Sequence, residues 1–518
     1  MSVDDLRQQL RERGYLTHGI ERWFALDPFG SRTFWSELAI VAAKAAILIA
    51  LFGALPLTAV MLARNHPLSA FEILCLFVSY AAAWLAAAFA MVIAIALVLK
   101  LRPALPIDTP RALLGISLVT AALLVAPVAV WWWRFDTAPE LPELAIGVTL
   151  SAIFFVIASI VVSAALLSFS IYELRRIPAI HQKRRGVPMT IAAAVLIALL
   201  FVPAYTDRDR AAAEAMVVTA PTTISIALIA VDGLTSEILQ SRPDLAGALP
   251  HVTSIEPIPG ESTTERWASL GTGVPVEQHG VRAIEGIRFR GGSHVLQQLS
   301  RAELVLKHVA RREPLPPTVR RRDYVWEIFA RRGIPSAAVN WWATSDEKHG
   351  ALTSISPETI FVAAKADPIR LDAIAEHRFA TQQARFATVY LPALDVILNR
   401  LELDPSQKLA LSLRALDGVA KTVRDARARG LEVIVVGMPG DGQRGHAVVA
   451  STIELRVTSS WDIAPAILAD MGFPTSTEMP GAKEHATIPT YGARQSHSSA
   501  QTVNDEYYEN LRSLGYIR

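Results

Sequence analysis

The chain has 518 residues, of which 52% are hydrophobic, and its 50 Lys and Arg residues nearly balance its 48 Asp and Glu residues. This length exceeds one typical domain, and a mean hydropathy of +0.32 excludes a wholly soluble protein. The net charge is only +2 at pH 7, and no nucleic-acid partner is expected. The single cysteine, Cys75, excludes an intrachain disulfide.

The first 205 residues hold most of the apolar excess. Residues 1–36 are polar and charged, without the pattern of a cleavable signal, and are expected to form a cytoplasmic segment. Five apolar stretches follow, each long enough to span, or nearly span, a bilayer core of about 30 Å. They are 37–63, 70–99, 112–133, 143–171 and 189–205, of which the last is the shortest. We therefore expect an α-helical transmembrane bundle of about five spans over residues 37–205.

Basic residues gather in alternate loops between these stretches, and such residues stay on the cytoplasmic side of a membrane. The clusters are Arg7, Arg11, Arg13, Arg22 and Arg32; Lys100, Arg102 and Arg111; and Arg175, Arg176, Lys183, Arg184 and Arg185. With an odd number of spans, this pattern predicts a cytoplasmic N-terminus and an extracytoplasmic C-terminal domain. A bacterial inner membrane is the working location, and the lipid bilayer is the first expected partner.

The C-terminal part of the chain alternates apolar runs with helical stretches. After a short linker expected at 206–222, apolar runs occupy 224–231, 334–340, 386–391 and 432–437, and helical patterns occupy 322–332 and 406–428. This alternation predicts an α/β domain over residues 223–518. Its sheet should be mostly parallel and covered by helices on both faces.

Two segments of this domain carry candidate chemistry. The apolar strand TISIALIAVDG (223–233) ends in Asp232, and PGESTTERWASLGTGVPVEQHGV (259–281) supplies a hydroxyl-bearing turn before a helix. Open α/β sheets bind their ligands at the carboxyl ends of their strands, and such a turn can present a nucleophile to the same crevice. The pairing predicts a metallo-phosphoesterase site.

Further motifs follow in a recognisable order. They are RRDYVWEIFARRGIPSAAVNWWATSDEKHG (321–350), VYLPALD (389–395), VIVVGMPGDG (433–442) and TSSWDIAPAILADMGFP (458–474), with YYENLRSLGYIR at the end. Together with the first two segments, they resemble the alkaline phosphatase superfamily, and most closely its type I phosphodiesterase/nucleotide pyrophosphatase branch. The resemblance extends over nearly all of residues 222–518.

The resemblance implies a site with two metal ions about 4 Å apart that activate a Ser or Thr nucleophile. Asp232 and Asp395 match metal-binding aspartates of the family. Thr263 matches the position of the family's nucleophile, which also contacts the metal ions. The structural alternative for Thr263, or for its neighbours Ser262 and Thr264, is the N-cap of the helix that follows.

The remaining ligand positions depart from the family. Asn399 stands where a histidine follows Asp395 by four residues, and residues 437–440 read Gly-Met-Pro-Gly instead of Ser-Asp-His-Gly. Amide, thioether and proline groups are poor substitutes for zinc ligands. Asp441 and His446 follow, and a remodelled loop would bring them to a metal. A divalent cation, Zn, Mn, Mg or Ca, is the implied cofactor, and the oxygen-rich remainder suits one Mg, Mn or Ca ion best.

Three further residues, His279, Trp341 and Trp342, resemble functional residues and are interpreted as structural. His279, in the Q-H-G-V turn, is a structural histidine in the family rather than a ligand. Trp342, with its neighbour Trp341, is interpreted as a core or rim aromatic rather than as a stacking platform.

Three functions are consistent with these residues. The first is a membrane-anchored phosphodiesterase or phosphatase that uses Thr263, Asp232 and Asp395. The second is a transferase that moves a phospho-group from a lipid donor, a comparison that rests on architecture alone. The third is a catalytically silent relative that binds an envelope component or a partner protein. The replacement of the family's metal ligands favours this third function. The substrate and the oligomeric state are not readable from the sequence.

Overall fold

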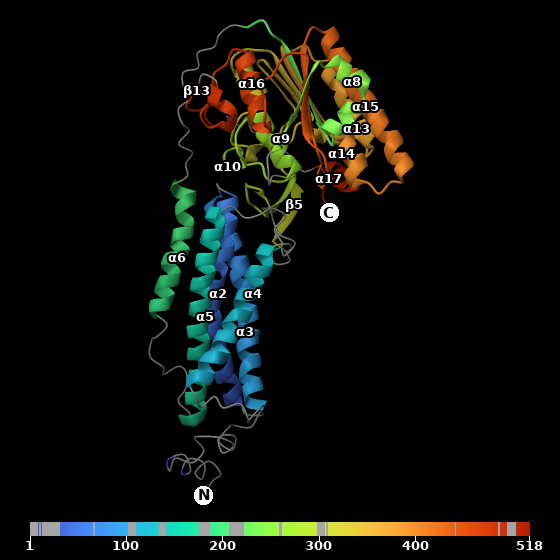
Figure 1. Ribbon diagram of the computed structural model, residues 1–518. Coiled ribbons are helices and arrows are strands. Elements are labelled where there is room, and N and C mark those ends of the chain that lie inside the picture. Colours follow the sequence, from blue (N-terminus) through green and yellow to red (C-terminus); the bar gives the residue numbers. More distant parts are fainter. Residues whose placement is uncertain are drawn as a thin grey trace. The chain divides into compact units, whose positions relative to one another are not determined.

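The computed structural model describes residues 32–65, 68–101, 110–133, 141–175, 187–206, 222–257, 262–297, 309–440, 442–484, 487–494 and 504–517, with positions 9, 12 and 306. The chain divides into two compact units (Figure 1). One contains Met1–Arg208 with the short segments Phe289–His294 and Leu299–Arg311, and the other contains the rest.

Long apolar helices make up the first unit. They are α2 (Arg32–Arg64), α3 (Ala70–Leu101), α4 (Pro110–Trp133), α5 (Leu141–Arg175) and α6 (Val187–Thr206). Helix α2 packs against α3 and α5, and α4 packs against α5. Many large apolar side chains remain exposed on this bundle, including Val119 at 62% and Leu123 at 57%. Such a surface suits contact with lipid rather than with water.

Three of these helices are long and apolar enough to cross a membrane within the described residues, namely at Leu38–Ala63, Ala70–Val98 and Leu144–Leu166. The apolar parts of the other two, Leu114–Val130 and Pro188–Val202, are shorter. Five helices thus lie where five spans are expected, and three of them meet the length of a full span. The five-span count and the orientation of the chain stay predictions.

An eight-stranded sheet forms the centre of the second unit, in the order β2-β11-β10-β1-β9-β6-β8-β7. The strands are β1 (Ile226–Asp232), β2 (His251–Ile255), β6 (Ser336–Val339), β7 (Glu347–His349), β8 (Leu352–Ile355), β9 (Phe386–Leu391), β10 (Glu432–Met438) and β11 (Ala447–Ser451). The five inner strands β10, β1, β9, β6 and β8 are mutually parallel. The outer strands β11, β2 and β7 pair antiparallel. The predicted α/β domain with a mostly parallel sheet is confirmed.

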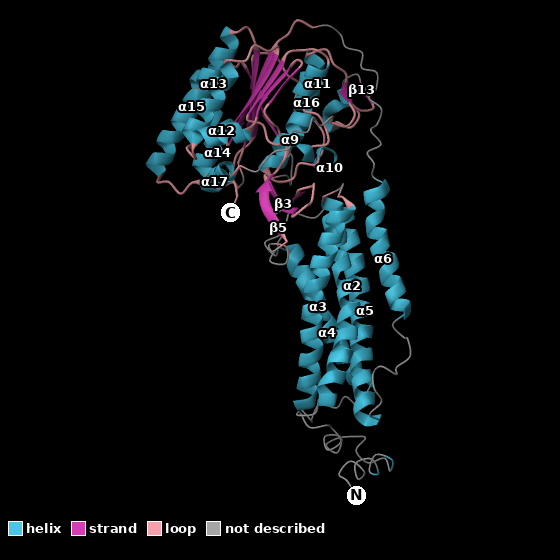
Figure 2. Cartoon of the chain, turned by 180° about the vertical axis from the view of Figure 1, so that it is seen from behind, coloured by secondary structure: helices cyan, strands magenta, loops and turns pink. Residues whose placement is uncertain are grey.

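Helices cover both faces of this sheet, as Figure 2 shows with α13 and α15 on one side and α11 and α16 on the other. The helices are α7 (Ser236–Gln240), α8 (Pro243–Ala248), α9 (Thr263–Thr272), α10 (Val276–His279), α11 (Val325–Arg331), α12 (Pro357–Ala364), α13 (Pro368–Ala380), α14 (Ala393–Asp395), α15 (Pro405–Ala428), α16 (Ile463–Asp470) and α17 (Asp505–Ser513). Single turns are η4 (Pro317–Val319), η5 (Val396–Arg400), η6 (Ser460–Asp462) and η7 (Pro480–Glu484). The strands β3 (Glu285–Phe289), β4 (Leu296–Gln297), β5 (Ala310–Pro314), β12 (Thr475–Ser476) and β13 (Thr487–Ile488) lie outside the large sheet.

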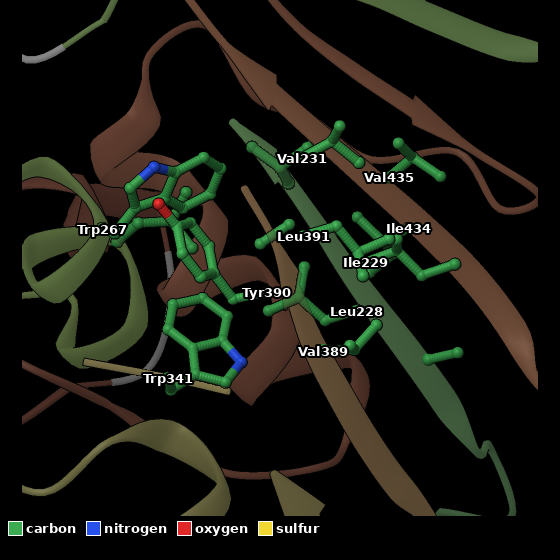
Figure 3. Close-up of a cluster of buried hydrophobic side chains, with 14 of the residues drawn as sticks. Leu228, Ile229, Val231, Trp267, Trp341, Val389, Tyr390, Leu391, Ile434 and Val435 are labelled. Carbon is green, nitrogen blue, oxygen red and sulfur yellow. The ribbon is translucent and has the colours of Figure 1, made fainter. Parts of the chain in front are cut away.

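The central strands are buried along their whole length because both faces of the sheet are covered. Every residue of β1 and of β9 is buried, which explains their unbroken apolar runs. An aromatic cluster packs beside them: the Trp267 ring lies 5.5 Å from the Tyr390 ring and 6.1 Å from the Trp341 ring (Figure 3). These edge-on contacts pack α9 against β9 and against the segment that follows β6.

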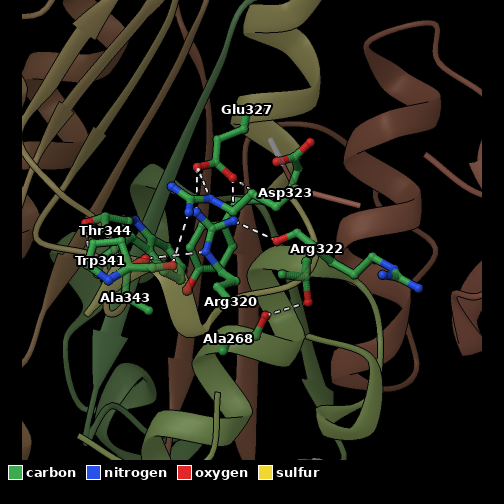
Figure 4. Close-up of polar contacts among 12 residues, drawn as sticks. Ala268, Arg320, Arg322, Asp323, Glu327, Trp341, Ala343 and Thr344 are labelled. Carbon is green, nitrogen blue, oxygen red and sulfur yellow. Dashed lines mark hydrogen bonds and ion pairs between the residues drawn. The ribbon is translucent and has the colours of Figure 1, made fainter. Parts of the chain in front are cut away.

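A buried ion pair anchors the segment before α11. The Arg320 guanidinium, whose side chain is fully buried, donates to both carboxylate oxygens of Glu327 and to the backbone carbonyl of Arg322 (Figure 4). Glu327 also accepts a hydrogen bond of 2.8 Å from the backbone N–H of Tyr324 at the helix N-terminus. The Arg320 guanidinium lies 3.9 Å from the centre of the Tyr324 ring. One guanidinium therefore holds together the loop, the cap of α11 and the aromatic cluster.

Replacing Arg320 by Ala should destabilise the second unit by about 3–5 kcal/mol, because Glu327 would stay buried without its closest counter-charge and keep only Arg494, at 3.5 Å. We expect a lower midpoint of thermal unfolding for Arg320→Ala. Arg512→Ala is the matched control, since Arg512 pairs with Glu509 at an exposed position of α17 and should change stability little. Equal small effects of the two substitutions would show that the buried pair does not stabilise the domain.

Candidate functional site

Asp232 and Asp395 lie together at the carboxyl end of the parallel sheet. Asp232 ends β1, and Asp395 ends the short turn α14 that follows β9, the strand beside β1. Gly233 adopts a positive φ of 84°, and a Cβ atom there would lie 2.6 Å from the backbone nitrogen of Asp395. Glycine at this position lets the ends of β1 and β9 approach closely. The third neighbouring strand, β10, ends at the same edge.

Asp232 is completely buried beside a tyrosine. The Tyr390 hydroxyl donates a 2.8 Å hydrogen bond to Oδ2 of Asp232, and Oδ1 has no hydrogen-bond partner among the described residues. Burial, followed by the nearby charge of Asp395, raises the pKa of Asp232 to about 8. At neutral pH this carboxyl group is therefore mostly protonated.

Thr263 is the first residue of α9 and does not cap the helix. Ser262 is the N-cap: its hydroxyl accepts from the backbone N–H of Glu265, and the Glu265 carboxylate accepts from the backbone N–H of Ser262. The Thr263 hydroxyl instead accepts from Nη2 of Arg266 at 3.3 Å, and Nη1 of the same guanidinium donates to the carbonyl of Pro439 at 2.9 Å. Thr263 is thus buried beside a cation at the end of β10.

Asp395 has both carboxylate oxygens engaged by side chains of the η5 turn. Oδ1 accepts a hydrogen bond of 2.8 Å from the Asn399 amide, and Oδ2 accepts one of 2.6 Å from Nε of Arg400. Asp395 is fully buried, and the Arg400 side chain is 14% exposed. Asp395 therefore belongs to a close ion pair with a neighbouring guanidinium.

The turn after β10 closes over the same carboxylate. A Cβ atom on Gly440 would collide with Oδ1 of Asp395 and would lie 2.5 Å from the Asn399 amide nitrogen. Gln443 holds this turn in place: it accepts from the backbone N–H of Gly440 at 2.9 Å and from Asn399 at 3.2 Å, and it donates to the carbonyl of Gly233 at 3.0 Å. Protein backbone fills the space beside Oδ1 of Asp395.

Two further candidate metal ligands from the sequence are Asp441 and His446. Asp441 lies outside the described residues. His446 pairs with Glu237, at 2.8 Å between Nδ1 and Oε1, and its side chain is 76% exposed. This pair keeps the His446 imidazole engaged on the surface at the start of β11. The structure therefore brings Asp232, Thr263, Asp395 and Asn399 to one edge of the sheet and gives His446 another partner.

His279 has the structural role that the sequence indicates. The backbone N–H of Val281 donates to its Nδ1 at 3.0 Å, which leaves Nε2 as the donor to the Ser269 hydroxyl at 2.9 Å. Burial, together with the nearby charge of Arg282, lowers the pKa of His279 to about 3. The neutral ring joins α9 to α10.

Four residues of this edge were not found from the sequence: Arg400, Arg266, Tyr390 and Asp372. The Asp372 carboxylate, on α13, accepts from the backbone N–H of Ala393 at 3.2 and 3.3 Å and so holds the turn that carries Asp395. Burial raises its pKa well above the usual range, with a further contribution from Glu376. The sequence offers a signal for Arg400, a cation five residues after a carboxylate at a strand end. It offers none for Asp372, which lies on a helix far from either motif.

These residues do not fit a two-metal centre. Such a centre requires several carboxylate and imidazole ligands that converge with free lone pairs. Among the described residues, no group of three His, Cys, Asp or Glu side chains is placed to hold a metal ion. Asp395 is ion-paired and covered, Asp232 accepts from the Tyr390 hydroxyl, and the charges of Arg400 and Arg266 act on Asp232.

Comparison with known proteins agrees with the motif order. Residues 226–439 match the family model of type I phosphodiesterase / nucleotide pyrophosphatase. No curated protein matches the chain.

Solved structures that the chain matches include two ectonucleotide pyrophosphatase / phosphodiesterase 5 proteins. Each match covers 41% of this chain and 56% of the solved protein. They are the murine protein in an inactive form in complex with AMP (14% identity, TM-score 0.30) and the human protein (15%, 0.28). A third is phosphonoacetate hydrolase from Sinorhizobium meliloti 1021 in complex with phosphonoformate (12%, 0.29), covering 42% of this chain and 57% of its own. The chain thus spans little more than half the length of these proteins.

Replacing Asp232 by Asn should stabilise the domain at alkaline pH. The folded-state pKa of Asp232 lies above its value near 3.8 in the unfolded chain, so the folded state retains a proton that the unfolded chain releases. That contribution is fully present below pH 4 and is lost as the pH rises towards 8. Relative to the wild type, Asp232→Asn should gain on the order of 2–4 kcal/mol between pH 4 and pH 8.

Thermal unfolding of the full chain in detergent at both pH values measures this gain. Asp244→Asn is the control, because the exposed Asp244 carboxylate is paired with Arg242 and its pKa is lowered rather than raised. A loss of stability in Asp232→Asn at both pH values is the behaviour expected of a metal ligand and would contradict this prediction.

Proposed function

We propose that the domain matching the type I phosphodiesterase/nucleotide pyrophosphatase family at residues 226–439 is a membrane-anchored, catalytically silent relative that works by binding. Its ligand would be an extracytoplasmic envelope component or a partner protein. The observation that carries the proposal is the state of Asp395, a fully buried carboxylate that is bound by Asn399 and Arg400 and covered by Gly440.

Metal-dependent hydrolysis would require this arrangement to open. A cation at Asp395 would have to displace the Arg400 guanidinium, and the Gly440 turn would have to move away from Oδ1. Each change costs free energy that a preformed site does not require, which supports a binding role over two-metal catalysis.

One observation favours a remaining enzymatic role and defines the second candidate function. Thr263 is not used as a cap, and its hydroxyl lies 3.3 Å from the Arg266 guanidinium. A threonine beside a cation at a helix start could accept a phospho-group, either in hydrolysis or in transfer from a lipid donor. This alternative keeps Thr263 as nucleophile and needs a single Mg, Mn, Zn or Ca ion at Asp232 and Asp395.

The apolar helices give the proposed location. Three of them are long enough to cross a membrane, and the basic residues in alternate loops favour a cytoplasmic N-terminus. The phosphodiesterase-like domain would then face the extracytoplasmic space, where envelope lipids and glycans are accessible.

The proposal predicts no phosphodiester turnover that depends on Thr263 and a metal. The full chain in detergent should hydrolyse bis(p-nitrophenyl) phosphate, with Zn, Mn, Mg or Ca added, no faster than its Thr263→Ala variant. Ser262→Ala is the control for damage to α9, since Ser262 supplies the cap and has no proposed chemical role. Turnover that EDTA and Thr263→Ala both abolish, and that Ser262→Ala retains, would establish the phosphoesterase instead.

A further inference from the structure

The side chain that engages Asp395 is a permanent cation. Nε of Arg400 donates to Oδ2 of Asp395 at 2.6 Å, and the carboxylate is fully buried. A guanidinium remains protonated at any physiological pH, and it pairs well with a carboxylate. A buried carboxylate thus receives its counter-charge from within the protein.

The other face of Arg400 contacts the C-terminal tail. The centre of its guanidinium lies 4.3 Å from the centre of the Tyr516 ring, and a Cβ atom on Gly515 would lie 3.2 Å from Cβ of Arg400. The Tyr516 ring in turn packs edge-on against Trp342 at 5.4 Å and against Phe361 at 5.7 Å. Stacking on an aromatic face stabilises a guanidinium that is also ion-paired.

Three segments therefore meet at this ion pair. Asp395 comes from the end of β9, Gly440 from the turn after β10, and Tyr516 from the tail that follows α17. Asn399 and Gln443 join the first two through hydrogen bonds of 2.8 to 3.2 Å. These contacts hold the strand ends together in the way that shared ligation of an ion would.

We propose that Arg400 is a built-in replacement for a metal ion: its guanidinium neutralises Asp395 and ties the strand ends to the C-terminal tail, so that the fold is independent of divalent cations. This inference rests on the proposed function and deepens it by naming the residue that keeps the site free of metal. It assigns Arg400 a positioning role and no contact with substrate.

The test is the effect of metals on thermal unfolding of the full chain in detergent, followed by tryptophan fluorescence. The wild type should unfold at the same temperature in EDTA, in MnCl₂ and in ZnCl₂. Arg400→Met, which keeps much of the side-chain volume and removes the charge, should lower the midpoint in EDTA by about 5–10 °C. Added Mn²⁺ or Zn²⁺ should restore part of that loss, because Asp395 would become available to a cation.

Two further variants control for misfolding. Arg400→Lys keeps the charge and should retain most of the stability without responding to metal. Arg400→Met combined with Asp395→Asn removes both charges, and it should regain stability in EDTA and lose the metal response. The double variant decides the question if Arg400→Met alone fails to fold.

The outcomes separate the two proposals. A wild-type midpoint that rises with metal would overturn the proposed function itself. A wild type that ignores metal, together with an Arg400→Met variant that is as stable as the wild type or does not respond to metal, would overturn only the role of Arg400. A double variant as unstable as Arg400→Met would also overturn that role, since charge imbalance would not be the cause.

Discussion

The ion pair between Asp395 and Arg400 determines what this edge of the sheet can do. A carboxylate without solvent must be paired or protonated, and here the pairing cation is covalently part of the chain. The pair lets the turn at Gly440 pack directly on Asp395 and lets Tyr516 close over the guanidinium. Asp232, one strand away, accepts a hydrogen bond from the Tyr390 hydroxyl, and burial raises its pKa to about 8. The Thr263 hydroxyl lies beside the Arg266 guanidinium.

Residues 226–439 match the type I phosphodiesterase / nucleotide pyrophosphatase family model, and the parallel strands within them bring Asp232 and Asp395 to one edge of the sheet. Around Asp395, the groups at the edge satisfy one another through hydrogen bonds and an ion pair, and such a network rigidifies this part of the fold. At Asp232, by contrast, Oδ1 has no hydrogen-bond partner among the described residues.

The sequence predicts the scaffold well because hydrophobic patterns are local. The runs at β1, β9 and β10 are continuous because both sheet faces are covered, and the helix at α15 follows its own periodicity. Asp232 and Asp395 meet because each follows a parallel strand. The partners of these carboxylates are not local: Arg400 and Tyr516 are over 100 residues apart, and Asp372 acts from α13. In the membrane part, three apolar helices have the length of a full span, and the apolar parts of the other two are shorter.

Metal content of the purified full-length chain tests the central claim most directly. After loading with Zn, Mn, Mg and Ca and removal of the excess, elemental analysis should find far less than one ion per chain, with no difference between the wild type and Asp232→Ala. One tightly held ion per chain in the wild type, lost in Asp232→Ala, would mean that the carboxylates are ligands and that the ion pair opens to admit a metal.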